Sequence, residues 1–417
     1  MKEQTVSKVP EIRFREFKDD WQEKALGELF PITSAARVHK NEWCQSGVPF
    51  FRSSDVVSSF KGNENKKAFI SHELYEELSA KVGRVKSGDM LVTGGGSIGI
   101  PYLVKTDEPL YFKDADLLWF KIREAVDSNF IYTFFCSRPF RRYLKSISHI
   151  GTIAHYTVEQ AKGTPVTLPR DSSEQTQIGR YFRELDSLIG LHQRKHDKLV
   201  TLKKAMLQKM FPQSGTTTPK IRFKGFSEEW VEEKLGKLGA FSKGQGYSKS
   251  DLATSGTPIV LYGRLYVNYQ TAISGVDTFV VEKKGSVKSA GKEVIVPASG
   301  ETAEDIARAS AIVTKGIILG GDLNIIFPFD ELDSYFLALT LSNGKPQTDL
   351  ARRAQGKTVV HVRKADLESV LIPFPKLAEQ QKIGNYFRTL DSLISKHAIH
   401  LQKLQQIKSA CLEKMFV

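Results

Sequence analysis

The chain contains an internal repeat. The stretch "PEIRFREFKDDWQEKALGEL" from Pro10 matches "PKIRFKGFSEEWVEEKLGKL" from Pro219, an offset of 209 (219 less 10). Further on, "EQTQIGRYFRELDSLI" from Glu174 matches "EQQKIGNYFRTLDSLI" from Glu379, an offset of 205 (379 less 174). The 417 residues are thus two copies of one plan, and a tandem duplication of this kind predicts internal pseudo-twofold symmetry.

The longer matched segments read as helices with a recurring residue at every seventh position. These positions are Ile178, Leu185, His192, Leu199 and Met206 in the first copy, and Ile383, Leu390, His397, Leu404 and Cys411 in the second. Sustained heptads of mostly apolar residues are typical of coiled coils. Since each copy supplies one such helix, we expect the two to pack on each other antiparallel, although parallel pairing with another chain would also cover them.

Between each lead-in and its helix, strand-like apolar runs, glycine turns and short helical pieces follow in the same order in both copies. The predicted fold is therefore α+β, with two mixed α/β domains joined by two long antiparallel coiled-coil helices. We place its segments at 1–171 (lead-in and first domain), 172–213 (first helix), 214–375 (linker, lead-in and second domain) and 376–417 (second helix). The linker is "PQSGTTTPK" from Pro212, which is rich in Pro, Gly and Thr.

The formal net charge of +13 indicates a polyanionic partner. We find neither an apolar run long enough to span a bilayer nor a signal peptide ahead of Pro10, so nucleic acid is preferred to a membrane. A soluble basic protein without such a partner stays the alternative. Cys44, Cys136 and Cys411 lie far apart in the sequence, which suggests no disulfide framework and no zinc site, and fits a reducing cytoplasm.

The stretch "LVTGGGSIGIPY" from Leu91 has the glycine spacing of a dinucleotide-binding fingerprint. That motif requires a helix after its glycines, whereas Pro101 and an alternating apolar pattern favour strand, turn, strand. The second copy places "PASGE" opposite "TGGGS" and keeps one of the glycines. The stretch is therefore interpreted as a turn that presents backbone and small side chains to a partner.

We find no catalytic constellation in the sequence. Gly356, Lys357 and Thr358 imitate the end of a P-loop, but Ala351 stands where its first glycine belongs. Asp277 and Glu282-x-Lys284 resemble the carboxylate set of a metal-dependent nuclease and lack a counterpart in the first copy.

Polar and basic residues that suit contact with bases and phosphates gather around the turns of the variable regions. In the first copy the candidate DNA-binding residues are Arg37, His39, Lys40, Arg52, Ser53, Ser54, Thr93, Gly94, Gly95, Ser97, His149, Thr152 and His155. In the second copy they are Lys243, Gln245, Tyr247, Lys249, Tyr262, Arg264, Tyr266, Ser299, Glu301, Lys357 and Thr358. Ordinary surface loops are the competing interpretation for any one of them.

The two lead-ins, "SGDMLVTGGGSIG" and the paired helices with "LDSLI" and "KMF" together resemble the specificity (S) subunits of type I restriction-modification systems. The resemblance covers essentially the whole chain. It implies two target-recognition domains on double-stranded DNA, each reading half of a split sequence. It also implies two methyltransferase subunits and two restriction-translocase subunits as partners.

On this resemblance the chain itself is non-catalytic and holds no cofactor. S-adenosylmethionine, ATP and Mg²⁺ belong to the partner subunits of an adenine-N6 methyltransferase and restriction complex. Two alternatives remain at this stage: a nucleotide-dependent enzyme that uses Gly94 to Gly99, and a stand-alone DNA-binding regulator or scaffold. Binding of NAD or S-adenosylmethionine by the isolated chain would favour the first, and site-specific binding without a partner the second.

Overall fold

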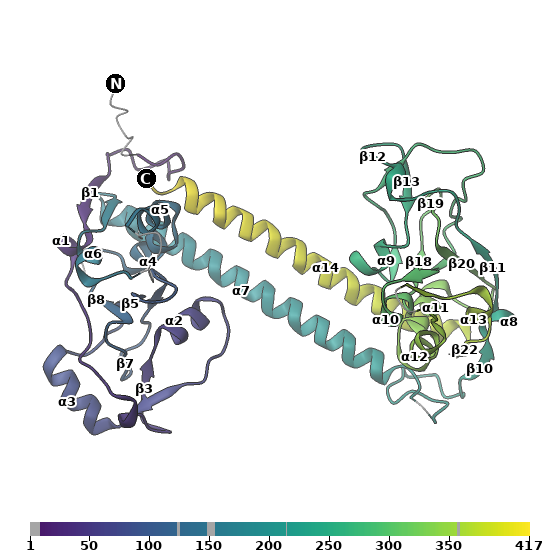
Figure 1. Ribbon diagram of the computed structural model, residues 1–417, viewed down its shortest axis with the longest axis horizontal. Helices are drawn as coiled ribbons and strands as arrows, with labels where there is room; N and C mark the ends of the chain where they lie inside the picture. Colours follow the sequence, from purple (N-terminus) through teal and green to yellow (C-terminus); the bar gives the residue numbers. More distant parts are fainter. Residues whose placement is uncertain (1–8, 123–125, 148–154, 214, 357–358) are drawn as a thin grey trace. The chain divides into compact units, whose positions relative to one another are not determined.

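The computed structural model describes residues 9–122, 126–147, 155–213, 215–356 and 359–417. The chain divides into two compact units, Met1–Gln193 with Ile399–Val417, and Arg194–Ala398. Two long helices, α7 (Ser172–Lys209) and α14 (Leu377–Lys414), each begin in one unit and end in the other (Figure 1). Each unit therefore combines a mixed α/β domain, the first part of one helix and the last part of the other.

The first unit is built on an antiparallel sheet of order β2-β8-β5-β6 (Ile32–Thr33, Leu117–Phe120, Met90–Thr93, Pro101–Leu103). Side chains along a strand alternate between its two faces. In β5, Met90 and Val92 join one apolar cluster, while Leu91 joins another. Both faces are thus covered, which explains why this strand is a continuous apolar run instead of an alternating one.

One face of this sheet is covered by α4 (Ser128–Cys136) and α5 (Arg138–Ile147), and the helix α2 (Ser53–Phe60) packs near the other. The side chain of Asp127 caps α4 by accepting a hydrogen bond from the Phe130 amide at 2.8 Å. A second sheet has the order β4-β3-β7 (Ala68–Ile70, Val48–Phe51, Tyr111–Phe112) and packs on α3 (His72–Val82). The two helices α4 and α5 are separated at Ser137.

The second unit repeats this plan with additional strands. Its larger sheet has the order β11-β20-β16-β18-β14 (Gly239–Lys243, Leu323–Pro328, Val294–Pro297, Ser310–Ile312, Ala272–Ile273). The smaller one has the order β12-β15-β13-β19 (Leu252–Ala253, Phe279–Val280, Thr257–Val260, Ile318–Leu319). The helices α11 (Ser334–Leu341) and α12 (Gly344–Arg353) follow β20 as α4 and α5 follow β8. The mixed α/β architecture expected from the sequence is confirmed.

The lead-in of each unit is tied to the start of that unit's long helix by a buried ion pair. Arg13 donates to both carboxylate oxygens of Glu174 at 2.6 and 2.8 Å, and Arg222 donates to both oxygens of Glu379 at 2.7 Å. Each glutamate side chain is only 1% exposed. Two-stranded ribbons, β1 with β9 (Gln22–Ala25, Pro165–Leu168) and β10 with β22 (Val231–Lys234, Leu371–Phe374), close the same ends of the domains.

Within each unit the two long helices run antiparallel. In the first unit the Lys408 ammonium lies 2.5 Å from Asp186 and Cys411 contacts Tyr181, so residue numbers fall along α14 as they rise along α7. In the second unit Lys203 lies 2.5 Å from Asp391. Among the heptad positions, Ile178, Leu185, Ile383 and Leu390 are buried, because the first turns of both helices pack into a domain.

The residues after each long helix complete the core of the unit that the helix enters. Phe416 is 5% exposed and its ring lies among those of Trp21, Phe130 and Phe182, at centroid distances of 5.5–6.5 Å. In the second unit Phe211 takes the equivalent place beside Trp230 and stacks on Phe336 at 5.6 Å. Of the helices described, none combines the length and the apolar character that crossing a membrane requires.

Candidate nucleic-acid interface

The glycine stretch of the first unit is a connection between two antiparallel strands. β5 pairs with β6 through Met90 with Leu103 and Val92 with Pro101, as strand, turn, strand predicts. No helix N-terminus follows the glycines, since residues Pro101–Leu103 form the second strand. The arrangement that a dinucleotide fingerprint requires is therefore absent here, which removes the basis of the nucleotide-binding alternative.

Hydrogen bonds of a buried residue fix the base of the turn, and its tip is exposed to solvent. The buried Thr93 hydroxyl donates to the Ser97 carbonyl at 2.5 Å and accepts from the Ile100 amide at 2.9 Å. Gly94 is buried, and a Cβ there would lie 2.8 Å from the Tyr156 carbonyl oxygen. Gly96 has a φ of +70° with nothing within 4 Å of a Cβ, and Ser97 is exposed. Residues 93 and 94 thus shape the turn, while 96 and 97 face outward.

In each unit this stretch lies against a second polar segment, at His155 in the first unit and at residues 360–361 in the second. Gly95 bridges to His155, and the Tyr156 amide donates to the Gly94 carbonyl at 2.8 Å. The second unit has the same arrangement as a short ribbon of β17 (Ser299–Gly300) and β21 (Val360–His361). His155 is exposed, whereas His149, Thr152, Lys357 and Thr358 lie outside the described residues.

A short helix is fastened to the turn in the first unit. Both the Ser53 hydroxyl and the Gly94 amide donate to the Asp116 carbonyl, at 2.9 and 2.8 Å. The start of α2 is therefore fixed beside the glycine turn. Exposed Ser54, the next residue of α2, accepts a hydrogen bond from Asn65 at 3.2 Å.

The basic candidates of the first unit differ in how far their side chains are engaged in hydrogen bonds and ion pairs within the protein. The Arg52 guanidinium donates to both oxygens of Asp55 at 2.8 and 3.0 Å, and to the Lys66 carbonyl at 2.5 Å. Arg37 pairs with Asp114 at 3.1 Å, but its side chain is 70% exposed. His39 and Lys40 are exposed at the start of a 3₁₀ turn. Arg37, His39 and Lys40 are thus accessible to a partner, while Arg52 mainly holds the loop between β3 and β4.

In the second unit, aromatic and acidic candidates gather beside the turn. Tyr262 and Tyr266 meet edge to face at 6.0 Å, and burial raises the Tyr266 pKa to about 12, with Tyr262 and Glu301 as smaller causes. Glu301 follows β17 directly and is exposed. Ser299 is buried, and its hydroxyl donates to Asp322 at 3.2 Å. The structure therefore brings Tyr262, Tyr266 and Glu301 together at one surface.

Arg264 begins α9 (Arg264–Val267), between these two tyrosines in sequence, and its side chain is 13% exposed. It donates to Asp277 at 2.6 Å, and this hydrogen bond lowers the Asp277 pKa. Its Nε is buried without a partner among the described residues. Asp277 is 81% exposed, so one side of the ion pair faces solvent.

The remaining candidates of the second unit lie on the loop after β11. Lys243, Gln245 and Lys249 are exposed. Tyr247 is 7% exposed, and its hydroxyl contacts Ser286 at 2.6 Å and accepts from the Lys283 amide at 2.6 Å. Tyr247 therefore anchors this loop, while the lysines and the glutamine face outward.

A basic helix face beside the first turn was missed by the sequence analysis. On α5, Phe140 and Leu144 are buried over the turn, and a Cβ on Gly99 would lie 2.2 Å from Leu144 Cδ1. The same helix exposes Arg142 and Lys145, which suit contact with a phosphate backbone. The signal was "RPFRRYLKSI", in which basic residues flank apolar positions four apart.

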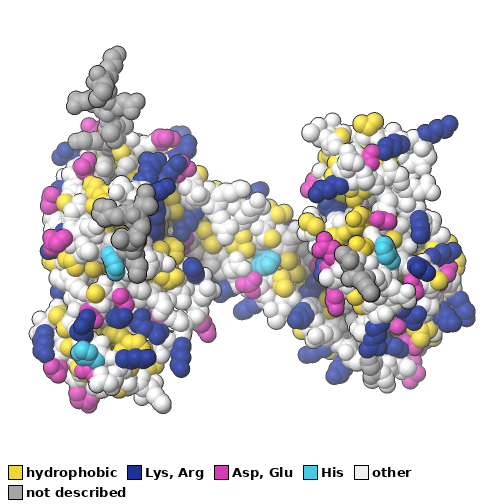
Figure 2. Space-filling view, viewed as in Figure 1, with side chains coloured by type: hydrophobic (Ala, Val, Ile, Leu, Met, Phe, Trp, Pro, Cys, Tyr) yellow, Lys and Arg dark blue, Asp and Glu magenta, His cyan; other side chains and the backbone are white. Residues whose placement is uncertain are grey.

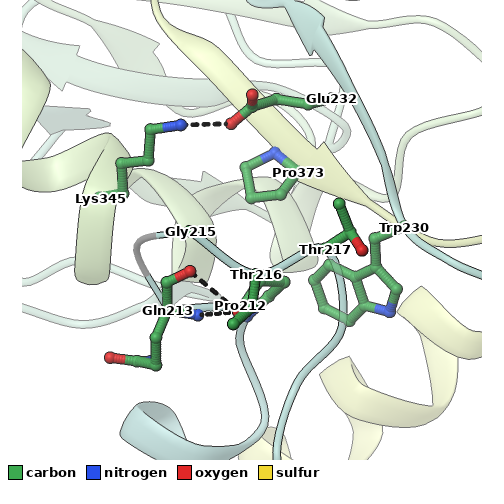
Figure 3. A pocket seen from close by; sticks show the side chains of 9 residues that line it. All are labelled: Pro212, Gln213, Gly215, Thr216, Thr217, Trp230, Glu232, Lys345 and Pro373. Carbon is green, nitrogen blue, oxygen red and sulfur yellow. Dashed lines mark hydrogen bonds and ion pairs between the residues drawn. The ribbon is translucent and has the colours of Figure 1, made fainter.

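The cavity drawn in Figure 3 lies away from these residues. A cavity of about 200 Å³ in the second unit lies between the linker and the domain, where Trp230, Pro212 and Pro373 line it beside the Lys345–Glu232 ion pair of 2.8 Å (Figure 3). None of the candidate DNA-binding residues lines it. No group of three or more metal-ligating side chains occurs among the described residues.

The visible surface of each unit carries Lys and Arg side chains interspersed with Asp and Glu (Figure 2). The net positive charge is thus spread over this face and not confined to one patch. Such a surface supports general attraction to a polyanion, while discrimination must come from particular side chains at the turns.

The family model for the type I restriction modification DNA specificity domain matches the chain twice, over residues 18–201 and 227–409. S.HindORF215P, named as a type I restriction enzyme specificity subunit of Haemophilus influenzae, is 27% identical over 146 residues. That match covers 34% of this chain and about a third of the relative, 35% of its length.

Two longer matches extend over nearly the whole chain. A protein named as the type I restriction enzyme MjaX specificity subunit of Methanocaldococcus jannaschii is 23% identical over 95% of this chain and 92% of its own length. The crystal structure of a type I restriction-modification S subunit from M. genitalium aligns with a TM-score of 0.58 at 16% identity, covering 98% of this chain and 99% of that one. At this identity the structural likeness bears on the fold alone.

Proposed function

The chain belongs to the family of type I restriction-modification specificity subunits, and on that premise we propose that each of its two units binds one half of a bipartite DNA target. The observation that carries this proposal is the turn that lies against a second polar segment in both units, with different side chains in each. A shared backbone pairing that carries different side chains suits two readers of two different sequences.

Discrimination in this proposal comes from residues in and beside these turns. Gly95, Ser97, Ser54 and His155 would face the duplex in the first unit, and Tyr262, Tyr266 and Glu301 in the second. Base contacts in the major groove give about 1–3 kcal/mol of discrimination for each good pair. Exposed cations such as Arg37, Lys40, Lys243 and Lys249 would add affinity that depends on salt and not on sequence.

The two long helices act as the spacer between the readers. Their antiparallel contacts within each unit and their heptads support an antiparallel coiled coil related by an internal pseudo-twofold axis. The segments proposed for this arrangement are 1–171, 172–213, 214–375 and 376–417. A rigid spacer would determine the number of base pairs between the two halves of the target.

Catalysis belongs to partners in this proposal. Two methyltransferase subunits would use S-adenosylmethionine to methylate an adenine, and two restriction-translocase subunits would use ATP and Mg²⁺, in the cytoplasm. The adenine must leave the base stack to react, so a subunit that holds the duplex in register serves that step. The chain itself needs no cofactor for its task.

A domain exchange tests the proposal. Replacing residues 48–170 with the corresponding region of another family member should change one half of the methylated target and leave the other half unchanged. The measurement is methylation-sensitive sequencing of DNA from cells that carry the complete system, with the unaltered chain as control. A target altered in both halves would contradict separate reading by the two units.

A further inference from the structure

At one exposed position the two connections carry side chains of different hydrogen-bonding chemistry. In the paired arrangement Ser97 of the first unit corresponds to Glu301 of the second, and both are exposed. A hydroxyl both donates and accepts hydrogen bonds, whereas a carboxylate only accepts them. The second turn therefore presents a chemical requirement that the first does not.

The Glu301 carboxylate differs from three other acids of the same unit, which accept hydrogen bonds within it. Asp305 accepts a hydrogen bond from Thr302 at 2.7 Å, and Asp322 accepts one from Ser299. Glu293 accepts hydrogen bonds from the backbone amides of residues 290–292. Glu301 forms no hydrogen bond or ion pair with any described residue. Its acceptor oxygens are thus available to an external donor.

The surroundings of Glu301 suit a base edge better than a phosphate. The half-buried rings of Tyr262 and Tyr266 lie beside it, and apolar Val267 is 85% exposed on the same helix as Tyr266. A phosphate would repel the carboxylate. The groups of the major groove that can donate a hydrogen bond to a carboxylate are the exocyclic amines, namely N4 of cytosine and N6 of adenine.

We propose that Glu301 accepts a hydrogen bond from an exocyclic amino group, cytosine N4 or adenine N6, in the half-target that the second unit reads. This inference rests on the proposed function and adds the base chemistry of one half. Glu301 excludes guanine O6 and thymine O4 at its position, because two acceptors face each other there. The first unit carries no such restriction at Ser97.

The test removes the amine and the carboxylate separately and together. The full chain is assembled with its methyltransferase partner, and its binding is measured on duplexes in which each cytosine or adenine of the second half-target is replaced by 2-pyrimidinone or purine, which lack the amino group. At one position the unaltered chain should lose about tenfold or more in affinity. Glu301→Ala, which has no side-chain acceptor, should lose much less at that same position, and the base there distinguishes cytosine from adenine.

A matched control separates base reading from overall charge. Glu304→Ala makes the same charge and side-chain change three residues away, at an exposed site in α10 (Ala303–Ile306), and should behave like the unaltered chain. Equal sensitivity of the unaltered chain and Glu301→Ala at every position overturns the inference, and so does an equal effect of Glu304→Ala. If the unaltered chain prefers no sequence at all, the proposed function fails instead.

Discussion

Single residues show first how the protein uses its own charges. Arg52 and Arg264 looked like base readers in the sequence, yet each is held by a carboxylate of the same unit, Asp55 or Asp277. Asp55 is three residues from its partner, but Asp277 is thirteen residues away and comes close only when β15 folds beside β13. A sequence pattern identifies a cation suited to contact with DNA. It does not show which carboxylate forms an ion pair with that cation in the folded unit.

Removing the lead-in arginine should destabilise the first unit. Arg13→Ala leaves Glu174 with 1% exposure and without its bidentate partner, at a cost of about 3–5 kcal/mol. Hydrogen exchange in urea should show early opening of residues 128–136 with the second unit unaffected. Lys81→Ala, which breaks an exposed pair with Glu77, should change stability by no more than about 0.5 kcal/mol. Equal behaviour of the two variants would contradict a structural role for the buried pair.

The cysteines should differ in reactivity. Burial raises the Cys136 pKa to about 11, although Lys408 and Arg141 oppose the shift, while Cys44 is exposed. Because an unfolded thiol ionises near its usual value of about 8.5, the stability from the neutral buried thiol is present below that pH and is lost as pH rises toward 11. Iodoacetamide at pH 8, followed by mass spectrometry, should modify Cys44 in the native protein and Cys136 only after unfolding. Comparable native rates at both sites would refute this.

Helices and strands could be predicted wherever the sequence repeats or its apolar residues recur at a regular spacing. The heptads predicted two long helices, and the apolar residues on both sides of Gly94 to Gly99, together with Pro101, predicted the hairpin of β5 and β6. The alignment of "KMF" in both copies was visible, but not where Phe211 and Phe416 pack. A periodic pattern shows which side of a helix is apolar, whereas the socket that receives its last residues is formed by elements hundreds of residues away.

Truncating the ring at the end of α14 should therefore open the first unit and not the second. Phe416→Ala removes a ring that is 5% exposed, at an expected cost of about 3–5 kcal/mol. Hydrogen exchange should report faster opening around Trp21 and Phe130. The reciprocal variant Phe211→Ala should open the region around Trp230 and Phe336 instead. Opening of the wrong unit, or of neither, would contradict this packing.

At the scale of the whole molecule, the proposed spacer leads to a prediction about target geometry. Four residues inserted into both helices, after Gln193 and after Ala398, add about 6 Å and about 40° while they keep the contacts within each unit. One base pair rises about 3.4 Å and turns about 35°. The gap between half-targets should lengthen by one or two base pairs, with both halves unchanged.

Sequencing of methylated sites measures that gap. The same insertion after Thr217, in the linker between the copies, should leave it unchanged, because no part of the two helices is lengthened there. An active complex with the original gap after the double insertion would show that the helices connect the units without determining their separation.

Because the residues after α14 pack in the first unit, the order of synthesis limits when each unit can be completed. During synthesis the second unit, residues 194–398, is complete before Phe416 exists, although most of the first unit was made earlier. At about 5–20 residues per second the ribosome needs roughly 10–45 s to travel from Gln193 to Phe416. For that interval the aromatic socket around Trp21 and Phe130 stays without its last ring, so the half of the protein that is made first is the half that can be finished only last.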